Sequence, residues 1–368
     1  MNNTSPKICH FTSVHPRFDT RIYYKQLKSL KKLTNDVCLV VADGKGNELT
    51  SDGIQIIDAG KPRGRINRFL AARKKVYKKA SEINADIYQF HDPELLKYGL
   101  KLKRKGKKVI YDSHEDVPRQ ILNKPYLKFL PKTLISGIVE KNENKIVAEL
   151  DHVLCATDHI THRFQKYNQN AFTIRNYPVI DELKADINWD EKENKVCYVG
   201  AIARTRGIRE MADAVNKSKA TFELAGKFSS DALKQEILDQ DGDKIKFYGF
   251  ADRSLVRKIY RKSKAGLVTL HPTVSYKDAL PVKMFEYMLA GVPVITSNIP
   301  LWEGIIREAE CGLAVNPFNT DEIAAAIDKI ISDDVLAEKM GRNGQQAIME
   351  KYNWQNEEKK LLEIYAKL

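Results

Sequence analysis

The chain has 368 residues, which favours two domains, and its 43% apolar content excludes wholesale disorder. It has no run of 18 apolar residues and no apolar stretch in its first twenty residues, so we expect neither a membrane-spanning helix nor a signal peptide. The net charge of +13 is uneven, because residues 1–180 hold 33 Lys and Arg against 18 Asp and Glu. This excess predicts that the first half meets a polyanion, either nucleic acid or an anionic membrane.

The five cysteines are scattered along the chain, and most lie within or beside apolar runs: Cys9, Cys38, Cys155, Cys197 and Cys311. Small buried thiols in a reduced, cytosolic setting account for them. Their spacing is not that of a metal site.

A predicted strand at residues 8–14 leads into a charged loop and then a helix at residues 22–32. In a Rossmann-like half, the loop after the first strand faces the ligand crevice. We therefore expect His15, Asp19 and Arg21 to point into that crevice. The alternative is a charged turn in which Asp19 caps the helix.

Two further strands are predicted at residues 37–42 and 54–57, and a helix at residues 63–80. Apolar residues fall on one side of this helix, and basic residues such as Arg65, Arg68 and Lys74 crowd elsewhere. The pattern is that of a basic amphipathic helix, with the apolar side in the core and the basic side available to anionic lipid.

Histidines beside acids end the next two strands. The strand at residues 86–90 runs into His91, and the strand at residues 109–111 runs into Asp112 and His114. The carboxyl edge of an open α/β sheet is where such folds bind ligands. We expect both histidines there. We do not expect them to bind a metal, because they lack close ligand spacing along the chain.

Residues 121–134 interleave apolar residues with three lysines and contain two prolines, which argue against one continuous helix. The segment is either a loop packed on its domain or an element that dips into a membrane interface. The charge of this half favours the membrane interpretation, since each basic group near an anionic surface contributes on the order of 1 kcal/mol.

A helix at 134–150, a strand at 153–156 and a helix at 160–167 follow.

The second half opens with a strand at residues 196–199, a loop from Gly200 to Gly207 and a helix from residue 208. A strand, a glycine-bearing loop and a helix form an anion site, because free N–H groups at the helix start attract phosphate. Arg206 is the predicted diphosphate ligand, with Arg204 as a possible second cation. The alternative is a solvated basic turn.

Two more strands, at residues 221–226 and 245–248, end in turns that carry Lys227 and Phe250. A helix at 255–262 and a strand at 265–270 come next. Helices at 302–306, 320–331 and 336–351, an edge strand at 311–315 and a last helix ending at residue 368 complete the chain.

Residues 276–298 form the most informative stretch: a loop with Asp278, a helix at 283–290 that carries Glu286, and a buried strand at 292–296. The helix start suits a diphosphate, and a carboxylate one to two turns later can accept both ribose hydroxyls. An acid in the preceding loop can hold hydroxyls of a donor sugar. The alternative is a helix start that follows an acidic loop, with Glu286 solvated.

Asp278-x7-Glu286, followed by Tyr-Met-Leu-Ala-Gly-Val-Pro-Val-Ile, resembles the E-x7-E signature of retaining glycosyltransferases of family 4. The first acid is Asp rather than Glu. The resemblance implies an α/β protein of the GT-B fold, with two Rossmann-like domains facing each other across a cleft. It assigns residues 1–178 to a basic, membrane-facing acceptor domain, 190–351 to a donor domain and 352–368 to a helix that crosses back to the first domain.

The resemblance also implies roles for individual residues. Those expected to bind the donor are Gly200, Arg204, Arg206, Lys227, Phe250, Asp278, Ala279, Leu280, Lys283 and Glu286. Those expected on the acceptor side are His15, Asp19, Arg21, His91 and His114. The residues expected to act in catalysis are His114, Asp278 and Arg206, with no metal and no cofactor other than the nucleotide-diphosphate sugar, most simply a UDP-sugar.

The sequence thus predicts transfer of a sugar, with retention, to a saccharide acceptor that is lipid-linked and belongs to capsule, exopolysaccharide or O-antigen synthesis. The protein would work in the cytoplasm, on the inner face of the cell membrane. The alternatives are another GT-B enzyme, such as a nucleotide-sugar epimerase, or a nucleic-acid-binding protein, for which no RNA-binding motif is found. The sugar, the base and the linkage stay open.

Overall fold

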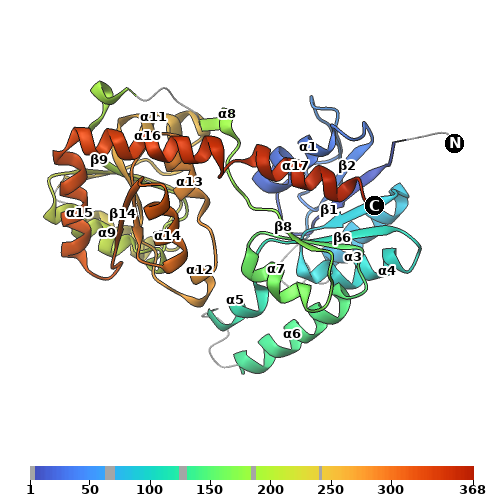
Figure 1. Cartoon of the computed structure of the whole chain (residues 1–368). Coiled ribbons are helices and arrows are strands. Elements are labelled where there is room, and N and C mark those ends of the chain that lie inside the picture. The colour runs from blue at the N-terminus through green and yellow to red at the C-terminus, as the bar shows by residue number, and fades with distance from the viewer. Residues whose placement is uncertain (1–4, 63–70, 124–130, 184–187, 240–242) are drawn as a thin grey trace. The chain divides into compact units, whose positions relative to one another are not determined.

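The computed structural model describes residues 5–62, 71–123, 131–183, 188–239 and 243–368. The chain divides into two compact units, Met1–Asn176 with Gln355–Leu368, and Tyr177–Trp354. Each unit is built on one parallel or mainly parallel sheet covered by helices (Figure 1). The sequence Asn176-Tyr177-Pro178 with the acid-rich residues 181–193 predicts a linker between domains, whereas the second unit already begins at Tyr177 and the C-terminal helix contributes residues to the first unit.

The sheet of the first unit has eight strands in the order β3-β4-β2-β1-β5-β6-β7-β8. All neighbours pair in parallel except β3 and β4, which are antiparallel. The strands are β1 (Ile8–Phe11), β2 (Val37–Val41), β3 (Glu48–Leu49), β4 (Gln55–Asp58), β5 (Ile87–Phe90), β6 (Lys108–Ser113), β7 (His152–Cys155) and β8 (Ala171–Thr173).

The helix after β1 begins earlier than predicted and is not a plain α-helix. It is a π-helix, η1 (Thr20–Leu27), continued by α1 (Lys28–Leu30). The other helical elements of the unit are α3 (Arg73–Ile83), η3 (Pro93–Leu95), α4 (Leu96–Lys103), α5 (Val117–Asn123), α6 (Lys132–Val147), α7 (Asp158–Gln165) and most of α17 (Trp354–Tyr365). Helix α17, red in Figure 1, packs on this unit, where Tyr365 contacts His10 of β1.

The two faces of the first sheet differ in polarity because successive side chains of a strand point to opposite faces. One face carries Phe11 of β1, Phe90 of β5 and Tyr111 of β6, which belong to an apolar core cluster. The opposite face carries His10 of β1 and Asp112 of β6, both fully buried. Buried polar side chains need partners, so this second face must contain a hydrogen-bond network.

The sheet of the second unit has six strands, all parallel, in the order β11-β10-β9-β12-β13-β14, with β14 as the predicted edge strand. Apolar clusters cover both faces, as expected of a parallel sheet between helices. The strands are β9 (Glu193–Val199), β10 (Thr221–Ala225), β11 (Ile245–Phe247), β12 (Ser263–Val268), β13 (Val294–Ser297) and β14 (Gly312–Val315).

The helices of the second unit follow the strands in alternation. They are α8 (Ile180–Leu183), η5 (Trp189–Glu191), η6 (Arg204–Arg206), α9 (Ile208–Lys217), α10 (Asp231–Asp239), α11 (Arg253–Lys262), α12 (Val274–Lys277), α13 (Val282–Leu289), α14 (Pro300–Glu308), α15 (Thr320–Ser332) and α16 (Asp334–Glu350). Gly291 ends the α13 region with φ +64°, the left-handed conformation expected of a residue that follows a helix.

Two predictions fall partly outside the described residues. The basic helix predicted at 63–80 includes residues 63–70, with Arg65 and Arg68, and only its later part is described, as α3. The predicted membrane segment 121–134 includes residues 124–130. Within the described part of the chain, no helix combines the length and the apolar character that crossing a membrane requires.

Candidate functional site

In the first unit, β1, β5 and β6 are neighbours and run in parallel, so their carboxyl ends meet at one edge of the sheet. The residues after these strands therefore converge. Asp92, after β5, accepts hydrogen bonds from the Thr12 hydroxyl at 2.9 Å and the Ser13 hydroxyl at 3.0 Å, both after β1. His15 Nε2 lies 3.5 Å from the other oxygen of the Asp92 carboxylate.

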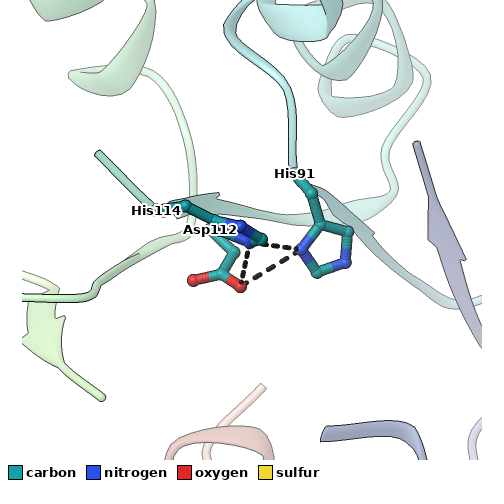
Figure 2. A group of neighbouring side chains, drawn as sticks. All are labelled: His91, Asp112 and His114. Carbon is teal, nitrogen blue, oxygen red and sulfur yellow. Dashed lines mark hydrogen bonds and ion pairs between the residues drawn. The ribbon is translucent and has the colours of Figure 1, made fainter. Parts of the chain in front are cut away.

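The centre of this edge is a triangle of two histidines and one carboxylate (Figure 2). His91 Nδ1 lies 3.1 Å from Asp112 Oδ2, His114 Nε2 lies 3.1 Å from the same oxygen, and the two ring nitrogens are 3.2 Å apart. His91 and Asp112 have fully buried side chains, whereas that of His114 is 16% exposed. Of the three side chains, His114 is thus the one that a ligand can reach.

Arg21 is buried and does not point into an open crevice. Its guanidinium binds Asp112 through Nε at 3.0 Å and Nη2 at 2.6 Å, and Nη1 donates to the carbonyl of Ile174 at 2.7 Å. Burial alone would raise the pKa of Asp112, but Arg21 and then His114 hold it well below its usual value. Asp112 is therefore an ionised carboxylate, and Arg21 and His91 can affect a ligand only through their neighbours.

His15 and Asp19 lie closer to the surface of the same edge. Asp19 caps η1, since its carboxylate accepts from the backbone N–H of Arg21 at 2.9 Å and of Ile22 at 3.0 Å. The capping alternative is therefore confirmed. Burial lowers the pKa of His15, but Asp19 and Asp92 outweigh it, so that the pKa lies above its ordinary value. His15 also packs beside His114, with ring centroids 4.7 Å apart.

His91 and His114 are far apart along the sequence, but the pairing of β5 with β6 brings their ring nitrogens within 3.2 Å of each other, so the spacing argument against a metal is wrong. Within the described part of the chain, His91, Asp112 and His114 form the one group whose ligand atoms are close enough to hold a metal ion. Arg21 already neutralises Asp112 and would repel a second cation. The metal-independent reaction stays a prediction.

Sequence reasoning missed the interior half of this network. His10 Nε2 lies 2.9 Å from the Tyr365 hydroxyl, and His10 Nδ1 lies 3.1 Å from His91 Nε2. Tyr365 also donates to Gln89 Oε1 at 2.6 Å. The available signal was the alternation of polar residues in buried strands, with His10 in β1 and Gln89 in β5.

In the second unit, Lys283 lies in the first turn of α13, and its side chain is buried against the loop after β9. Nζ sits 3.6 Å from the ring centroid of Tyr198, and a Cβ added to Gly200 would lie only 3.0 Å from it. Within the described residues Nζ has no hydrogen-bond partner. Burial and the nearby Arg206 lower the pKa of Lys283 well below its ordinary value, and Glu286 only partly opposes them.

The loop that holds this lysine is shaped by glycines. Gly200 has φ +140° and Gly207 has φ +72°, conformations that side chains rarely adopt. A Cβ on Gly207 would also lie 2.0 Å from the carbonyl oxygen of Thr269. Gly207 precedes α9, so the backbone of a helix start follows this loop directly.

The two arginines of the loop are placed differently. Arg206 is half-buried beside Tyr198 and Tyr276; burial lowers its pKa, but the two tyrosines raise it by more. Arg204 is 55% exposed and forms an ion pair with Glu236 at 2.7 Å. Arg206 therefore shares the surroundings of Lys283, whereas Arg204 is engaged with α10.

The acidic loop and helix of the E-x7-E-like segment lie on α12 and α13. Asp278 is exposed, and Ala279 and Leu280 are half-buried. The carbonyl of Ala279 accepts from Trp302 Nε1 at 2.7 Å, which anchors the loop. Helix α13 starts after Pro281, and the N-cap position provides no side-chain hydrogen bond to the first N–H groups of the helix.

Glu286 lies one turn further along α13 and is half-buried. Its carboxylate accepts from Arg253 Nη1 at 2.8 Å and from the Tyr260 hydroxyl at 3.4 Å. Two donors therefore hold the carboxylate in place. Lys227 and Phe250 follow β10 and β11, at the same edge of the sheet, and both are exposed.

Comparison with known proteins shows what the second unit is similar to. Residues 179–347 match the family model of glycosyl transferases group 1. An uncharacterised glycosyltransferase of Methanocaldococcus jannaschii is 26% identical over 202 residues, which is 50% of each chain. The chain thus spans about half the length of the curated relatives it matches.

Solved structures match both units. Sucrose-phosphate synthase of Thermosynechococcus elongatus has a TM-score of 0.77 at 18% identity and covers 98% of each chain. Anabaena HepE, solved with UDP-glucose, has a TM-score of 0.75 at 15% identity over 99% of this chain and 100% of that one. WaaG, a glycosyltransferase involved in lipopolysaccharide biosynthesis, has a TM-score of 0.70 at 14% identity over 97% and 99%. The predicted GT-B fold is confirmed.

Proposed function

We propose that this GT-B protein is a retaining glycosyltransferase of family 4 that moves a sugar from a nucleotide-diphosphate sugar to a saccharide acceptor. Three observations support the proposal. The second unit matches the glycosyl transferases group 1 model, and the fold matches glycosyltransferases along nearly the whole chain. In addition, Arg206 of the loop after β9 lies near Lys283, which is in the first turn of α13.

The observation that carries the proposal is the buried amino group of Lys283, which has no hydrogen-bond partner in the described residues. An ammonium group buried without a hydrogen-bond partner is costly, so such a group persists where a ligand supplies the missing oxygens. Arg206, the uncapped start of α13 and the backbone of the glycine loop surround it with further positive potential. A diphosphate fits this chemistry.

In this proposal the diphosphate leaves while Arg206 and Lys283 neutralise its growing charge. Glu286, oriented by Arg253, accepts the ribose hydroxyls, and Asp278 holds hydroxyls of the donor sugar. HepE was solved with UDP-glucose, which makes a UDP-sugar the first donor to test. Arg204 takes a secondary place, because Glu236 engages it.

We place the acceptor at the His114 edge of the first unit, with His15 beside it. The acceptor proposed is a lipid-linked saccharide of capsule, exopolysaccharide or O-antigen synthesis, met in the cytoplasm at the inner face of the membrane. The positive first half supports this proposal. So does α6, where Leu134 and Ile138 are each 61% exposed and lie in line with exposed Lys141 and Lys145.

The donor proposal is tested by thermal unfolding with UDP, GDP and dTDP. We expect one nucleotide to raise the Tm of the wild type, and Lys283→Met to abolish that shift. The control is Lys258→Gln, which removes a cation from an exposed position of α11. If Lys283→Met kept the full nucleotide shift, the diphosphate site would not include Lys283 and the proposal would lose its support.

Membrane association is tested by flotation with vesicles with and without anionic lipid. The double variant Leu134→Ser, Ile138→Ser should float less well than the wild type with anionic vesicles. Equal flotation of the two proteins would contradict the proposal that α6 contacts the membrane.

A further inference from the structure

A continuous chain of buried polar side chains leads from the C-terminal helix to His114. Its members are Tyr365, Gln89, Gln26, Asp112, His10, His91 and His114. The directions of its hydrogen bonds follow from Asp112, because an ionised carboxylate can only accept hydrogen bonds. The direction of every other bond can then be followed from group to group.

The amide side of the chain has a fixed direction. Gln26 Nε2 lies 2.9 Å from Asp112 Oδ2, and must be the donor because the carboxylate has no proton. The carbonyl oxygen of Gln26 therefore faces Gln89, whose Nε2 donates to it at 2.7 Å. The carbonyl oxygen of Gln89 in turn faces Tyr365, so the hydroxyl of Tyr365 donates its single proton there, at 2.6 Å.

The histidine side follows from the tyrosine. With its proton given to Gln89, the Tyr365 oxygen accepts from His10, which must carry its proton on Nε2. Burial, with the neighbouring histidine, lowers the pKa of His10, and burial lowers that of His91 to about 4, so both rings are neutral. His10 Nδ1 is then an acceptor, and His91 Nε2–H donates to it across 3.1 Å.

This leaves two acceptors facing each other. His91 Nδ1 has no proton, Asp112 Oδ2 has none, and the two atoms are 3.1 Å apart. Oδ2 also receives Arg21 Nε and Gln26 Nε2. His114 Nε2 lies within 3.2 Å of both acceptors and is the donor that relieves their repulsion.

We propose that this chain locks His114 as the Nε2–H tautomer, so that Nδ1 carries the lone pair of the His114 ring, whose side chain is 16% exposed. Reversing the chain would turn the carbonyl oxygen of Gln26 toward the Asp112 carboxylate, which is repulsive. Tyr365 is then a positioning residue that acts on His114 from another element, 251 positions along the chain.

The consequence for the reaction depends on the proposed function. A hydroxyl of the acceptor saccharide at this edge would donate a hydrogen bond to His114 Nδ1, and this bond would orient the hydroxyl oxygen. His114 Nδ1 would then take up part of the hydroxyl proton's charge as the glycosidic bond forms. A ring locked in the opposite tautomer would present an N–H and repel that hydroxyl proton. The chain therefore specifies a hydrogen-bond acceptor rather than a donor at this position.

The tautomers are measured directly by long-range ¹H–¹⁵N NMR of protein labelled at the rings of its eight histidines, assigned by single His→Gln variants. We expect His10 and His91 as neutral Nε2–H rings, and His114 with its proton on Nε2, in the full-length wild type. An Nδ1–H ring at His114 would overturn the proposal. A spectrum that changes with EDTA and returns with Zn²⁺ would also overturn it, in favour of a metal at the triangle.

Tyr365→Phe tests the positioning role, with Tyr167→Phe as the control because Tyr167 is 49% exposed. Tyr365→Phe should mix the tautomers of His10 and His91 and lower kcat about tenfold with an unchanged donor KM. Unchanged tautomers of His10 and His91 in Tyr365→Phe would contradict the positioning role of Tyr365. The NMR spectra are recorded without substrate. A wild-type protein that shows the expected tautomers but has no glycosyltransferase activity would therefore contradict the proposed function and not the tautomer assignment.

Discussion

The two candidate sites of this chain treat buried polar groups in opposite ways. In the first unit, His10, His91 and Asp112 have fully or nearly fully buried side chains, and each has a hydrogen-bond partner: Tyr365 for His10, His10 for His91 and Gln26 for Asp112. In the second unit, Lys283 is buried without a hydrogen-bond partner among the described residues, and the hydroxyl oxygens of Thr269 and Thr296 share that condition.

The difference shows which site is complete in the ligand-free protein. A network whose members satisfy one another is rigid and stabilising, because removal of one member leaves the others unpaired. A buried amino group without a hydrogen-bond partner lowers stability until a ligand provides one. Substitutions should therefore destabilise the first site and relieve the second, and each of the following predictions tests that contrast.

The largest effect is expected for Asp112→Ala. The change leaves the buried Arg21 guanidinium without its carboxylate, which should lower the free energy of unfolding by roughly 3–5 kcal/mol in urea denaturation. Asp36→Ala, at an exposed ion pair 3.5 Å from Lys7, should cost less than about 1 kcal/mol. Equal losses in the two variants would mean that the network contributes nothing special to stability.

Arg206→Ala should act on ligand binding rather than on folding. Loss of one charge-assisted hydrogen bond costs about 1.5–3 kcal/mol, so nucleotide affinity measured by calorimetry should fall roughly 10- to 100-fold. The matched control is Arg257→Ala on α11, an exposed arginine. An unchanged affinity in Arg206→Ala would separate this arginine from the nucleotide site.

Lys283→Met should not destabilise the ligand-free protein, and the comparison with wild type should depend on pH. The folded pKa of Lys283 lies well below 10.5, so between these values the unfolded chain binds a proton that the folded protein does not. Wild-type stability should therefore rise with pH in that window, relative to Lys283→Met, by up to about 1.4 kcal/mol per pH unit. Parallel stability curves would show that this amino group is not strained.

The smallest effect is expected for Asp19→Ala, which removes the cap of η1 and should cost about 1 kcal/mol. Hydrogen bonds from His15 and the backbone outweigh burial and lower the pKa of Asp19 below its ordinary 3.8. The contribution is therefore present above pH 3.8 and is lost as the pH falls through the folded pKa. Thermal unfolding of both proteins at pH 7 and in acid measures it, and a gap that widened in acid would contradict the assignment.

Much of the second site could be predicted from the sequence because it is local. Asp278, Lys283 and Glu286 lie within nine residues, and Gly200 and Arg206 lie on a single loop after a strand. A helix start, a glycine with positive φ and a carboxylate at helical spacing are properties of short segments. The alternation of strands and helices, and with it the α/β class, follows from periodicity in the same way.

Only the tertiary structure decided the first site. Parallel pairing brought His91 beside His114, and the packing of α17 on the sheet brought Tyr365 to His10 across most of the chain. The same contacts buried Arg21 and His91, which were expected to face a ligand. Sequence spacing fixes which residues share a helix turn or a strand face, whereas burial and hydrogen-bond partners depend on which segments pack together, and long-range packing alone sets those.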